Sequence, residues 1–598
     1  MIEKMKKITI LVFLEERERF VSKLRNLGVL HVSHVVSPDA HEVSFVDDRI
    51  AKIKKLISQI EPYIGERPDR RASSHERDVL SSADDTSEDL KIKRETEEKT
   101  EKLEQEKAWF GEWGNIDPED LSLLGKAGVK VRLYEIPSGE TKKVMSPAVH
   151  VIGKAAGKSR IALISGDIEE KLSFQEVFSP SRAEKKIEEE ITVLRNETNE
   201  IEDRMKDRAR GISACRECLA KLQKELISLH VRFGMKNEGE FAYVQGFSPE
   251  KAIPKIKKLC DKLEAGFISE EPDNLEETPT LITNPKWIEI IKPVFSFMNT
   301  LPGYGEFDIS FVFLIFFSLF FAMLIGDAGY GLVFIGGTFL ARRKFKKAPA
   351  EPFFLLYLLG GCTLVWGALT GTWFGIEQLA TAPIFKNMVI QKIGSFSGDN
   401  QNFIIQICFV IGAVHLTLAH IMKIAREINS LRAFGDAGWI MILWGMFFLA
   451  GKFVIGGNFP GFAGWLLAAG IVLVMFFTEP EKGLIKGMLS TLVQLPLSVI
   501  SAFSDIVSYL RLFAVGCATV VVADSFNKMA WPGVPSSFIA GFLSAIVLFL
   551  GHTLNIMLGC MAVIVHGIRL NMLEFSGHLG MQWSGKQYEP FKDDGAGR

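Results

Sequence analysis

Residues 504–523 read SDIVSYLRLFAVGCATVVVA, an apolar run in which Arg511 is the only basic residue. A helix of about 20 apolar residues crosses the hydrocarbon core of a bilayer. Arginine stays charged at physiological pH, and a charge at membrane depth is costly unless it meets water or an opposite charge. The run therefore predicts a membrane helix, and Arg511 is its sharpest functional candidate.

This run lies in the half of the chain that carries few charges. Of the 598 residues, the first 300 include 50 Lys/Arg and 55 Asp/Glu, whereas residues 301–598 include 19 and 16. The contrast predicts a solvated half followed by a membrane half, which disfavours a single soluble enzyme. Neither half is strongly basic, which disfavours a nucleic-acid-binding protein, and seven scattered Cys disfavour a secreted disulfide scaffold.

Eight apolar segments in the second half are candidate membrane spans. They cover about 309–325, 328–341, 353–374, 403–422, 436–455, 461–478, 488–523 and 537–572. The last two are unusually long, so we expect them to lie strongly tilted in the bilayer. The first two are short and separated by Gly326–Gly331, so a single long span is the alternative there.

The loop charges favour eight spans over seven. With a cytoplasmic amino terminus, the inside loops hold ten basic residues and the outside loops hold four, as the positive-inside rule requires, and both termini lie in the cytoplasm of the cell. Seven spans would reverse every later loop. The inside set is Arg342, Arg343, Lys344, Lys346, Lys347, Lys423, Arg426, Arg432, Lys482 and Lys486, and the outside set is Lys386, Lys392, Lys452 and Lys528.

The first half predicts an α+β domain with two small lobes. The amino terminus lacks a small-residue cleavage site and is not a signal peptide. Strands are predicted at 8–14 and 29–36, around a helix that Gly28 ends, and a second strand–helix–strand unit follows at 241–268. Two such units would form a ferredoxin-like proximal lobe from residues 1–43 and 236–270.

A helical arm is predicted between these two units. Apolar residues recur at steps of 3, 4 or 7 from Ile187 to Leu229, with charges between them, which is typical of a coiled coil. We expect an antiparallel coiled coil from residues 44–114 and 176–235, broken by a polar stretch at 62–87. A distal α/β lobe is predicted at 115–175, and a proline-containing linker at 271–307 leads to the membrane domain at 308–598.

Arg511 needs an opposite charge or a water-filled cavity. Asp505 is six residues away and lies on a different helical face, and no other carboxylate in that span is well placed. We therefore expect a partner carboxylate from another chain, at least part of the time. The alternative is a permanent ion pair within this chain that holds the bundle together.

The other ionisable residues in the apolar half are candidates for ion translocation with competing structural explanations. Arg569 and its neighbours His566, Glu574 and His578 lie near a membrane end, where snorkelling is an alternative. Asp327 lines a water-filled entrance or caps a helix. His415 and His420 relay protons or are polar residues satisfied between packed helices. The full candidate set is Arg511, Arg569, His566, Asp327, Glu574, Ser508, Asp505 and His415.

Three motifs are rejected as sites. GKAAGKS at 153–159 is one residue short of a phosphate loop, so no bound nucleotide is expected. Cys215 and Cys218 form a lone pair on a predicted coiled-coil helix, which is a poor zinc signal. The glycines of 326–331 favour close helix packing. No Ser/His/Asp constellation is recognisable, so we expect no catalytic residue, cofactor or metal.

Several motifs together resemble the membrane stator subunit of V-type and A-type rotary ATPases, called subunit a in eukaryotes and subunit I in prokaryotes. The resemblance covers essentially the whole chain, and SYLRLFA and HGIRLNMLEFSGHL are its most specific parts. The motifs are VFLEERERFVSKLRNLGVLHV (12–32), FAYVQGFSP (241–249), FSLFFAMLIGDAGYGL (317–332), WGALTGTWFG (366–375), SYLRLFA (508–514), HGIRLNMLEFSGHL (566–579) and YEPF (588–591).

The resemblance implies a non-catalytic subunit that couples H⁺ or Na⁺ translocation to ATP hydrolysis or synthesis. Arg511 falls on the essential stator arginine of the family, and Arg569 and His566 fall on helper positions of the ion path. Eukaryotic members carry an acidic residue where this chain has Gly559, so that part of their path is not carried over. The implied partners are a rotating proteolipid ring, a central-stalk coupling subunit and peripheral stalks.

Two other functions stay open from the residues alone. One is a self-contained secondary transporter with a cytosolic coiled-coil regulatory arm, although spans 1–4 and 5–8 show no convincing repeat. The other is a membrane-anchored coiled-coil scaffold, in which Arg511 at membrane depth would have no purpose.

Overall fold

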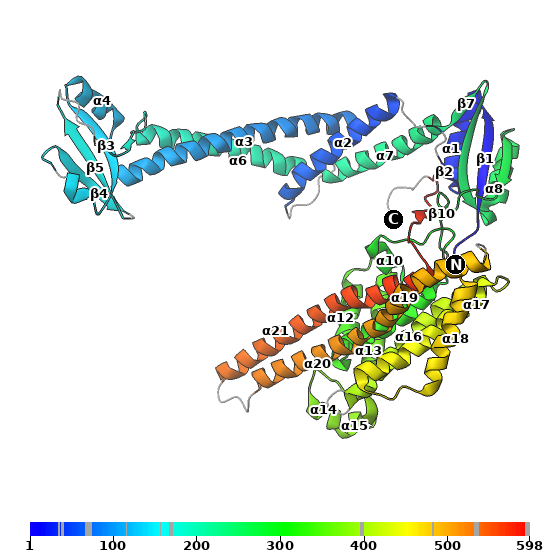
Figure 1. Ribbon diagram of the computed structural model, residues 1–598. Helices are drawn as coiled ribbons and strands as arrows, with labels where there is room; N and C mark the ends of the chain where they lie inside the picture. The colour runs from blue at the N-terminus through cyan, green and yellow to red at the C-terminus, as the bar shows by residue number, and fades with distance from the viewer. Residues whose placement is uncertain are drawn as a thin grey trace.

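The chain forms an elongated arm with a lobe at each end, next to a bundle of apolar helices (Figure 1). The computed structural model describes residues 1–33, 36, 41–65, 75–114, 116–144, 146–155, 157–166, 172–394, 400–480, 483–531 and 538–592. The predicted strand residues 34–35 and the loop lysine Lys482 lie outside these residues.

The proximal lobe is an antiparallel sheet in the order β2-β8-β1-β9, with β7 paired to β8. Helices α1 and α8 contribute its core, which includes Phe20, Leu24 and Ile256. Gly28 ends α1 in the left-handed conformation, with φ +63°. The elements are β1 (Met5–Phe13), η1 (Leu14–Glu16), α1 (Arg17–Leu27), β2 (His31–Ser33), β7 (Lys236–Glu238), β8 (Phe241–Pro249), η3 (Glu250–Ala252), α8 (Ile253–Lys262) and β9 (Gly266–Glu270).

The arm is built from four helices that pack in pairs, α3 with α6 and α2 with α7. Helix α3 begins at Glu76, so the predicted polar break at 62–87 is wrong over its last twelve residues, and 66–74 lie outside the described residues. Cys215 and Cys218 are buried in the seam. The elements are α2 (His41–Ile60), η2 (Glu61–Tyr63), α3 (Glu76–Trp113), α6 (Glu184–Ala209) and α7 (Ile212–Gly234).

The distal lobe is a small sheet in the order β4-β5-β3-β6. The segment that resembles a phosphate loop joins β4 to β5, so a strand follows it where a phosphate loop requires a helix. The elements are α4 (Pro118–Lys126), β3 (Lys130–Pro137), α5 (Thr141–Val144), β4 (Val149–Ala155), β5 (Lys158–Ser165) and β6 (Glu176–Val177).

The segment predicted as a linker is partly regular and meets the end of the chain. Strand β10 (Pro279–Thr280) pairs in parallel with β11 (Lys586–Gln587), and two short helices follow, α9 (Lys286–Glu289) and α10 (Lys292–Met298). Beyond β11, Phe591 is buried in the core of the proximal lobe, and its N–H donates to the Leu30 carbonyl at 2.8 Å. The carboxyl-terminal tail therefore fastens this lobe beside the helical bundle.

The apolar bundle contains five described helices long enough to cross a membrane, or six if a bent pair counts as one span. That pair is α11 and α12, which turn by 119° at Gly326–Asp327, and α18 is shorter. The predicted count of eight spans is therefore not confirmed, although each predicted segment is mostly helical over its described residues. The elements are α11 (Ser310–Ile325), α12 (Ala328–Lys344), α13 (Glu351–Thr370), α14 (Glu377–Thr381), α15 (Pro383–Lys386), η4 (Gln391–Ile393), α16 (Gln401–Arg426), α17 (Arg432–Ala450), η6 (Gly451–Ile455), α18 (Gly461–Phe477), α19 (Leu484–Ser508), α20 (Leu510–Ala530), α21 (Phe538–Ala562), η8 (Val563–Gly567), η9 (Leu570–Phe575) and α22 (Ser576–Leu579).

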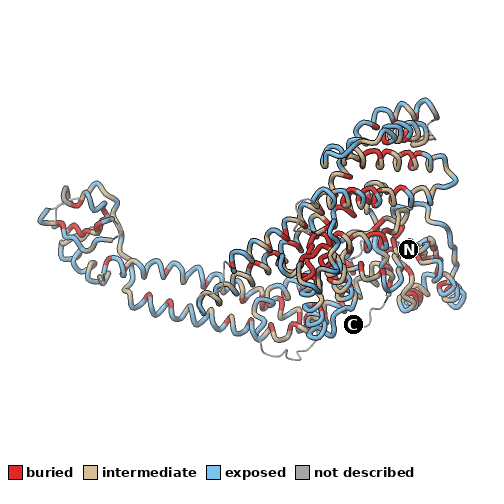
Figure 2. The backbone as a smooth tube through the Cα atoms, turned by 90° about the horizontal axis from the view of Figure 1, so that it is seen from below, coloured by how far each residue is buried: buried red, intermediate tan, exposed pale blue. Residues whose placement is uncertain are grey.

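Two very long helical runs flank the bundle. They cover 485–530 and 538–579, which are 46 and 42 residues long. At 1.5 Å per residue the first is about 69 Å long, more than twice the hydrocarbon thickness. Helices α20 and α21 lie side by side on a diagonal (Figure 1), while the buried residues concentrate in the middle of the bundle and the arm is mostly exposed (Figure 2).

Candidate functional site

Arg511 lies at the junction between α19 and α20. The break falls at Tyr509, and it brings Ser508 back toward Arg511. The Nε of Arg511 donates to the Ser508 carbonyl at 3.1 Å, and its Nη2 donates to the Ser508 hydroxyl. Because Arg511 is three residues after Ser508, these bonds fix the guanidinium at the start of α20.

Glu574 supplies the carboxylate for Arg511. Its Oε1 accepts from Arg511 Nη2 at 2.7 Å and from the Ser508 hydroxyl at 2.7 Å. The Glu574 side chain is 5% exposed and that of Arg511 is 25% exposed. The last helical run of this chain therefore brings a carboxylate beside the seventh predicted span, as in the alternative of an ion pair within the chain. A carboxylate from another chain, meeting Arg511 part of the time, stays a prediction.

Two polar atoms of the Arg511–Glu574 pair have no hydrogen-bond partner among the described residues. Nη1 of Arg511 has no hydrogen-bond partner among the described residues, and Oε2 of Glu574 is buried without one. Arg569 Nε is 3.7 Å from Glu574 Oε1, which is an ion pair rather than a hydrogen bond. The Arg569 side chain is 54% exposed. His566 makes no hydrogen bond within the described part of the chain, and its Nδ1 is buried.

Irregular helix geometry positions these groups. The segments η8 and η9 are π-helical turns that flank Ile568 and Arg569. Such turns often mark functional sites, because one extra residue per turn changes which side chains share a face. Here Arg569 and Glu574, five residues apart, meet at Glu574 Oε1.

A separate row of polar side chains begins at Asp505, three residues before Ser508. His578 Nε2 lies 3.1 Å from Asp505 Oδ2, and His578 Nδ1 lies 3.0 Å from His420 Nε2. His420 Nδ1 lies 2.9 Å from Asp436 Oδ1, and Lys423 Nζ is 3.0 Å from the same oxygen. Four elements, α16, α17, α19 and α22, therefore contribute to one continuous row.

His415 is held apart from this row. Its Nδ1 pairs with the Tyr509 hydroxyl at 2.8 Å, and its ring is stacked between Phe316 and Phe575 at centroid distances of 3.9 and 4.4 Å. His415 is fully buried. Aromatic packing thus explains its position, and the structure does not join it to His420.

Asp327 caps α12. Its carboxylate accepts four backbone N–H groups, those of Gly329, Tyr330, Phe374 and Gly375, at 2.7 to 3.2 Å. The side chain is buried, and Gly367 lets α13 approach so closely that a Cβ there would lie 2.1 Å from the Ala328 nitrogen. Of the two alternatives for Asp327, the geometry favours the cap.

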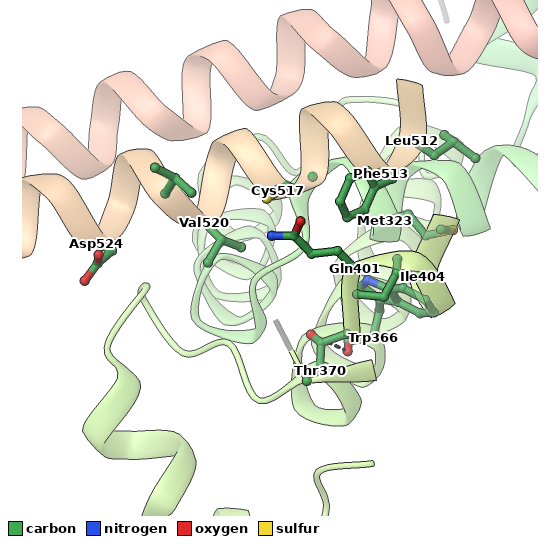
Figure 3. Close-up of a pocket in the computed structure, with 14 residues that line it drawn as sticks. Met323, Trp366, Thr370, Gln401, Ile404, Leu512, Phe513, Cys517, Val520 and Asp524 are labelled. Carbon is green, nitrogen blue, oxygen red and sulfur yellow. Dashed lines mark hydrogen bonds between the residues drawn. The ribbon is translucent and has the colours of Figure 1, made fainter. Parts of the chain in front are cut away.

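A cavity of about 220 Å³ lies along α20. One face of that helix lines it from Leu512, next to Arg511, to Asp524, and α11, α13 and α16 line the other side. The Gln401 side chain reaches across it toward α20 (Figure 3). The cavity therefore leads from Leu512, in the first turn of α20, along the helix toward its carboxyl end.

Sequence reasoning missed several residues. Asp436 lies near the start of the apolar helix α17, and no periodicity shows that it faces His420. A second network joins the Tyr330 hydroxyl to His552 at 2.8 Å and to Asn555 at 2.9 Å, while His552 pairs with Asn527 at 3.1 Å.

The described residues hold no group of three His, Cys, Asp or Glu side chains that could bind a metal ion.

Comparisons with known proteins match nearly the full length of the chain. It is 30% identical to V-type ATP synthase subunit I of Borreliella burgdorferi, over 99% of each chain. It is 28% identical to V-type ATP synthase subunit I 1 of Treponema pallidum, over 99% of this chain and 100% of that one. A-type ATP synthase subunit I of Methanocaldococcus jannaschii is 27% identical, over 75% of this chain and 70% of that one.

Two further comparisons add little. A crystal structure of the cytoplasmic N-terminal domain of subunit I, homolog of subunit a, of V-ATPase shares 13% identity and covers 44% of this chain and 99% of that chain. Its TM-score is 0.23, which is too low to carry an argument. No protein-family model matches the chain.

Proposed function

Because this chain belongs to the subunit I family of V-type and A-type ATP synthases, we propose that it is the non-catalytic membrane stator that carries the ion half-channels of a rotary ATPase. Family membership makes it a multi-pass membrane subunit of a larger complex, and this removes the self-contained transporter and the scaffold as alternatives. The observation that carries the proposal is the guanidinium of Arg511, which is part-exposed and whose Nη1 has no hydrogen-bond partner in the part of the chain that the structure describes.

The proposed role of Arg511 is electrostatic. A rotor carboxylate that faces lipid stays neutral, with an ion bound, because a bare charge there is too costly. Beside Arg511 the carboxylate ionises, since the guanidinium stabilises the anion and Nη1 offers it a hydrogen bond. The bound ion then leaves, and the same positive charge blocks an ion from crossing directly between the two half-channels.

Glu574 holds Arg511 in place during this exchange. The pair Arg511–Glu574 with Ser508 fixes the guanidinium while leaving Nη1 for the rotor. Arg569, at 3.7 Å from Glu574, adds a second positive charge at the same carboxylate. We assign Arg569 and His566 helper roles at the rotor-facing edge, where both lie on the last helical run.

The cavity along α20 is our candidate for the outer half-channel. It extends from Leu512 to Asp524, twelve residues and about 18 Å along the helix axis. In the proposed topology α20 runs outward, so Asp524 lies near the outer surface. The carboxylate of Asp524, paired with Lys528 at 2.7 Å, would then attract cations at the mouth.

The proposed topology keeps both termini in the cytoplasm. The 119° turn between α11 and α12 sends the chain back on itself. Whether this pair is a re-entrant loop or two full spans, the chain returns to the same side of the membrane, so the sides of all later loops are unchanged. We propose eight segments on this basis, with the long runs of α19–α20 and α21–α22 tilted in the bilayer.

The proposed partners are a proteolipid ring against α20 and α21, a central-stalk coupling subunit, and peripheral stalks on the two lobes. A large apolar face of α21 is exposed, including Phe542, Phe549 and Met557. The arm resists torque in this scheme, so the stator does not turn with the ring. H⁺ or Na⁺ would be the cargo.

The test uses the whole complex in proteoliposomes. Arg511→Ala should abolish ATP-driven ion uptake while the complex still assembles. Arg342→Ala, at the exposed end of α12, is the control for a lost positive charge, and it should pump normally. Normal uptake by Arg511→Ala would overturn the proposal.

A further inference from the structure

The row Asp505, His578, His420 and Asp436 contains more hydrogen bonds than neutral histidines can form. Each neutral imidazole carries one N–H, and an ionised carboxylate only accepts. The three contacts at 3.1, 3.0 and 2.9 Å engage all four ring nitrogens, and each contact needs one hydrogen. Two neutral imidazoles supply two, so with both carboxylates ionised the row holds one additional proton.

The surroundings fit a stored positive charge. His420 is 3% exposed and Asp436 is 6% exposed, so a charge in the middle of the row depends on the two carboxylates at its ends. The charged groups facing it are Asp505 on α19, Asp436 on α17 and Lys423 on α16, and the Trp439 ring stacks on His420. The members of the row thus come from α16, α17, α19 and α22.

The row also has two accessible ends. Asp505 is 26% exposed and lies six residues before Arg511, while His578 lies four residues after Glu574. At the far end Lys423 is 31% exposed, and it neighbours the loop with Arg426 and Arg432. In the proposed topology that loop is cytoplasmic, so the row leads from Asp505, six residues before Arg511, toward the inside.

We propose that this row is the inner half-path for the ion, and that it makes the cargo H⁺ rather than Na⁺. This inference rests on the proposed stator function. A proton passes along hydrogen bonds between imidazoles, whereas Na⁺ is a hard cation that needs several oxygen ligands. The central contact, His578 to His420, is nitrogen to nitrogen and offers Na⁺ no oxygen.

The transfer balances without any further reactant. With both carboxylates ionised, the additional proton makes His578 an imidazolium, with an N–H at both Nε2 and Nδ1. In one concerted step the N–H at His420 Nδ1 passes to Asp436 and then to water beside Lys423, while the N–H at His578 Nδ1 passes to His420 Nε2. Tautomer exchange then returns the hydrogen of His420 to Nδ1 and moves the remaining hydrogen of His578 from Nε2 to Nδ1. The free Nε2 of His578 accepts the proton that a rotor carboxyl group has released to Asp505, so each histidine gains one proton and loses one per cycle.

The competing explanation is a purely structural cluster that joins four helical elements. The test measures ATP-driven H⁺ uptake and ²²Na⁺ uptake by the complete complex in proteoliposomes. His578→Gln and His420→Gln keep a polar side chain but cannot carry a proton. Each should lower H⁺ uptake by about a hundredfold, and the remaining uptake should lose the solvent isotope effect of the unsubstituted complex.

Two controls separate the possible failures. His150→Gln, an exposed histidine on β4, should pump normally. If Arg511→Ala pumps normally, the stator function fails. If Arg511→Ala fails to pump but both assembled Gln variants pump normally, the relay alone is overturned.

The unsubstituted complex gives an independent answer if a variant does not assemble. H⁺ uptake that is independent of Na⁺ and slower in D₂O supports the relay. ATP-dependent accumulation of ²²Na⁺ overturns it.

Discussion

Nη2 of Arg511 lies 2.7 Å from Oε1 of Glu574, although the two residues are 63 positions apart in the sequence. The pair joins the start of α20 to the last helical run, next to a Ser508 hydroxyl that bonds the same oxygen. Because Glu574 stays bound to Arg511, the guanidinium keeps one opposite charge when a second carboxylate, from the rotor, arrives and leaves. That arrangement lowers the cost of keeping a permanent charge at membrane depth.

Glu574→Gln should weaken ion pumping without abolishing it. The amide keeps one acceptor for Arg511 but removes the charge, and a hydrogen bond to a charged group contributes about 1.5–3 kcal/mol. We expect ATP-driven uptake to fall about tenfold, measured in proteoliposomes at equal complex content. The double variant with Arg511→Ala should be no worse than Arg511→Ala alone, and additive losses would contradict the coupling.

Asp89→Asn should loosen the arm. Asp89 on α3 accepts from Arg204 at 2.7 Å and Arg208 at 2.6 Å, and the bond from Arg204 holds the pKa of this carboxyl below its ordinary 3.8. The stabilisation is therefore complete above about pH 4 and is lost as the pH falls through the folded-state pKa. Near pH 7 the cost should be about 1–3 kcal/mol.

Hydrogen exchange in α3 and α6 of the intact chain measures this effect. Asp84→Asn is the matched control, since Asp84 is 69% exposed in its pair with Lys52 and should contribute little. Equal protection in the two variants at neutral pH would refute the role of Asp89.

Asp327→Asn tests the cap against a role in the ion path. Asparagine offers one acceptor oxygen where the carboxylate offers two, so its NH₂ would face a backbone N–H and leave a donor unpaired, at a cost of about 1–3 kcal/mol. The yield of assembled complex should fall, while uptake per assembled complex stays unchanged. A loss of uptake in fully assembled complex would instead place Asp327 in the path.

Phe591→Ala should release the carboxyl-terminal tail from the proximal lobe. Phe591 is 5% exposed in the core of that lobe, and removing a buried Phe side chain costs about 3–5 kcal/mol. Faster hydrogen exchange in β2 and in the tail measures the release. Tyr588→Phe loses one bond, from the hydroxyl to the Val29 carbonyl at 2.6 Å, and should cost only about 1 kcal/mol.

Periodicity revealed much of the architecture. The 3.6-residue pattern marked the arm helices, and Gly28 marked the end of α1 because only glycine tolerates its positive φ cheaply. The start of α3 was missed, since residues 76–87 are mostly polar and Val79, Leu80 and Ala83 are their only apolar residues. Partner helices stabilise such a stretch, as Val79 and Ala83 pack in the same cluster as Ile53 and Cys215.

The site was only half visible in the sequence. Arg511 stands out because a charge in an apolar run is rare, and His566, Arg569 and Glu574 share a motif. The pairing of Glu574 with Arg511 and of Asp436 with His420 depends on how distant helices pack. Local spacing carries no information on such contacts, and π-helical turns further shift the faces that a 3.6-residue period predicts.

The burial of Phe591 in the proximal lobe bears on biosynthesis. The strands and helices of that lobe come from residues 5–33 and 236–270, yet one core side chain is translated only after every apolar helix. Domains generally fold as they leave the ribosome, amino-terminal parts first. Here the proximal lobe, whose first strand emerges first, completes its core only after the carboxyl-terminal tail has been translated. A completed core in this lobe therefore reports that the whole helical bundle has been made.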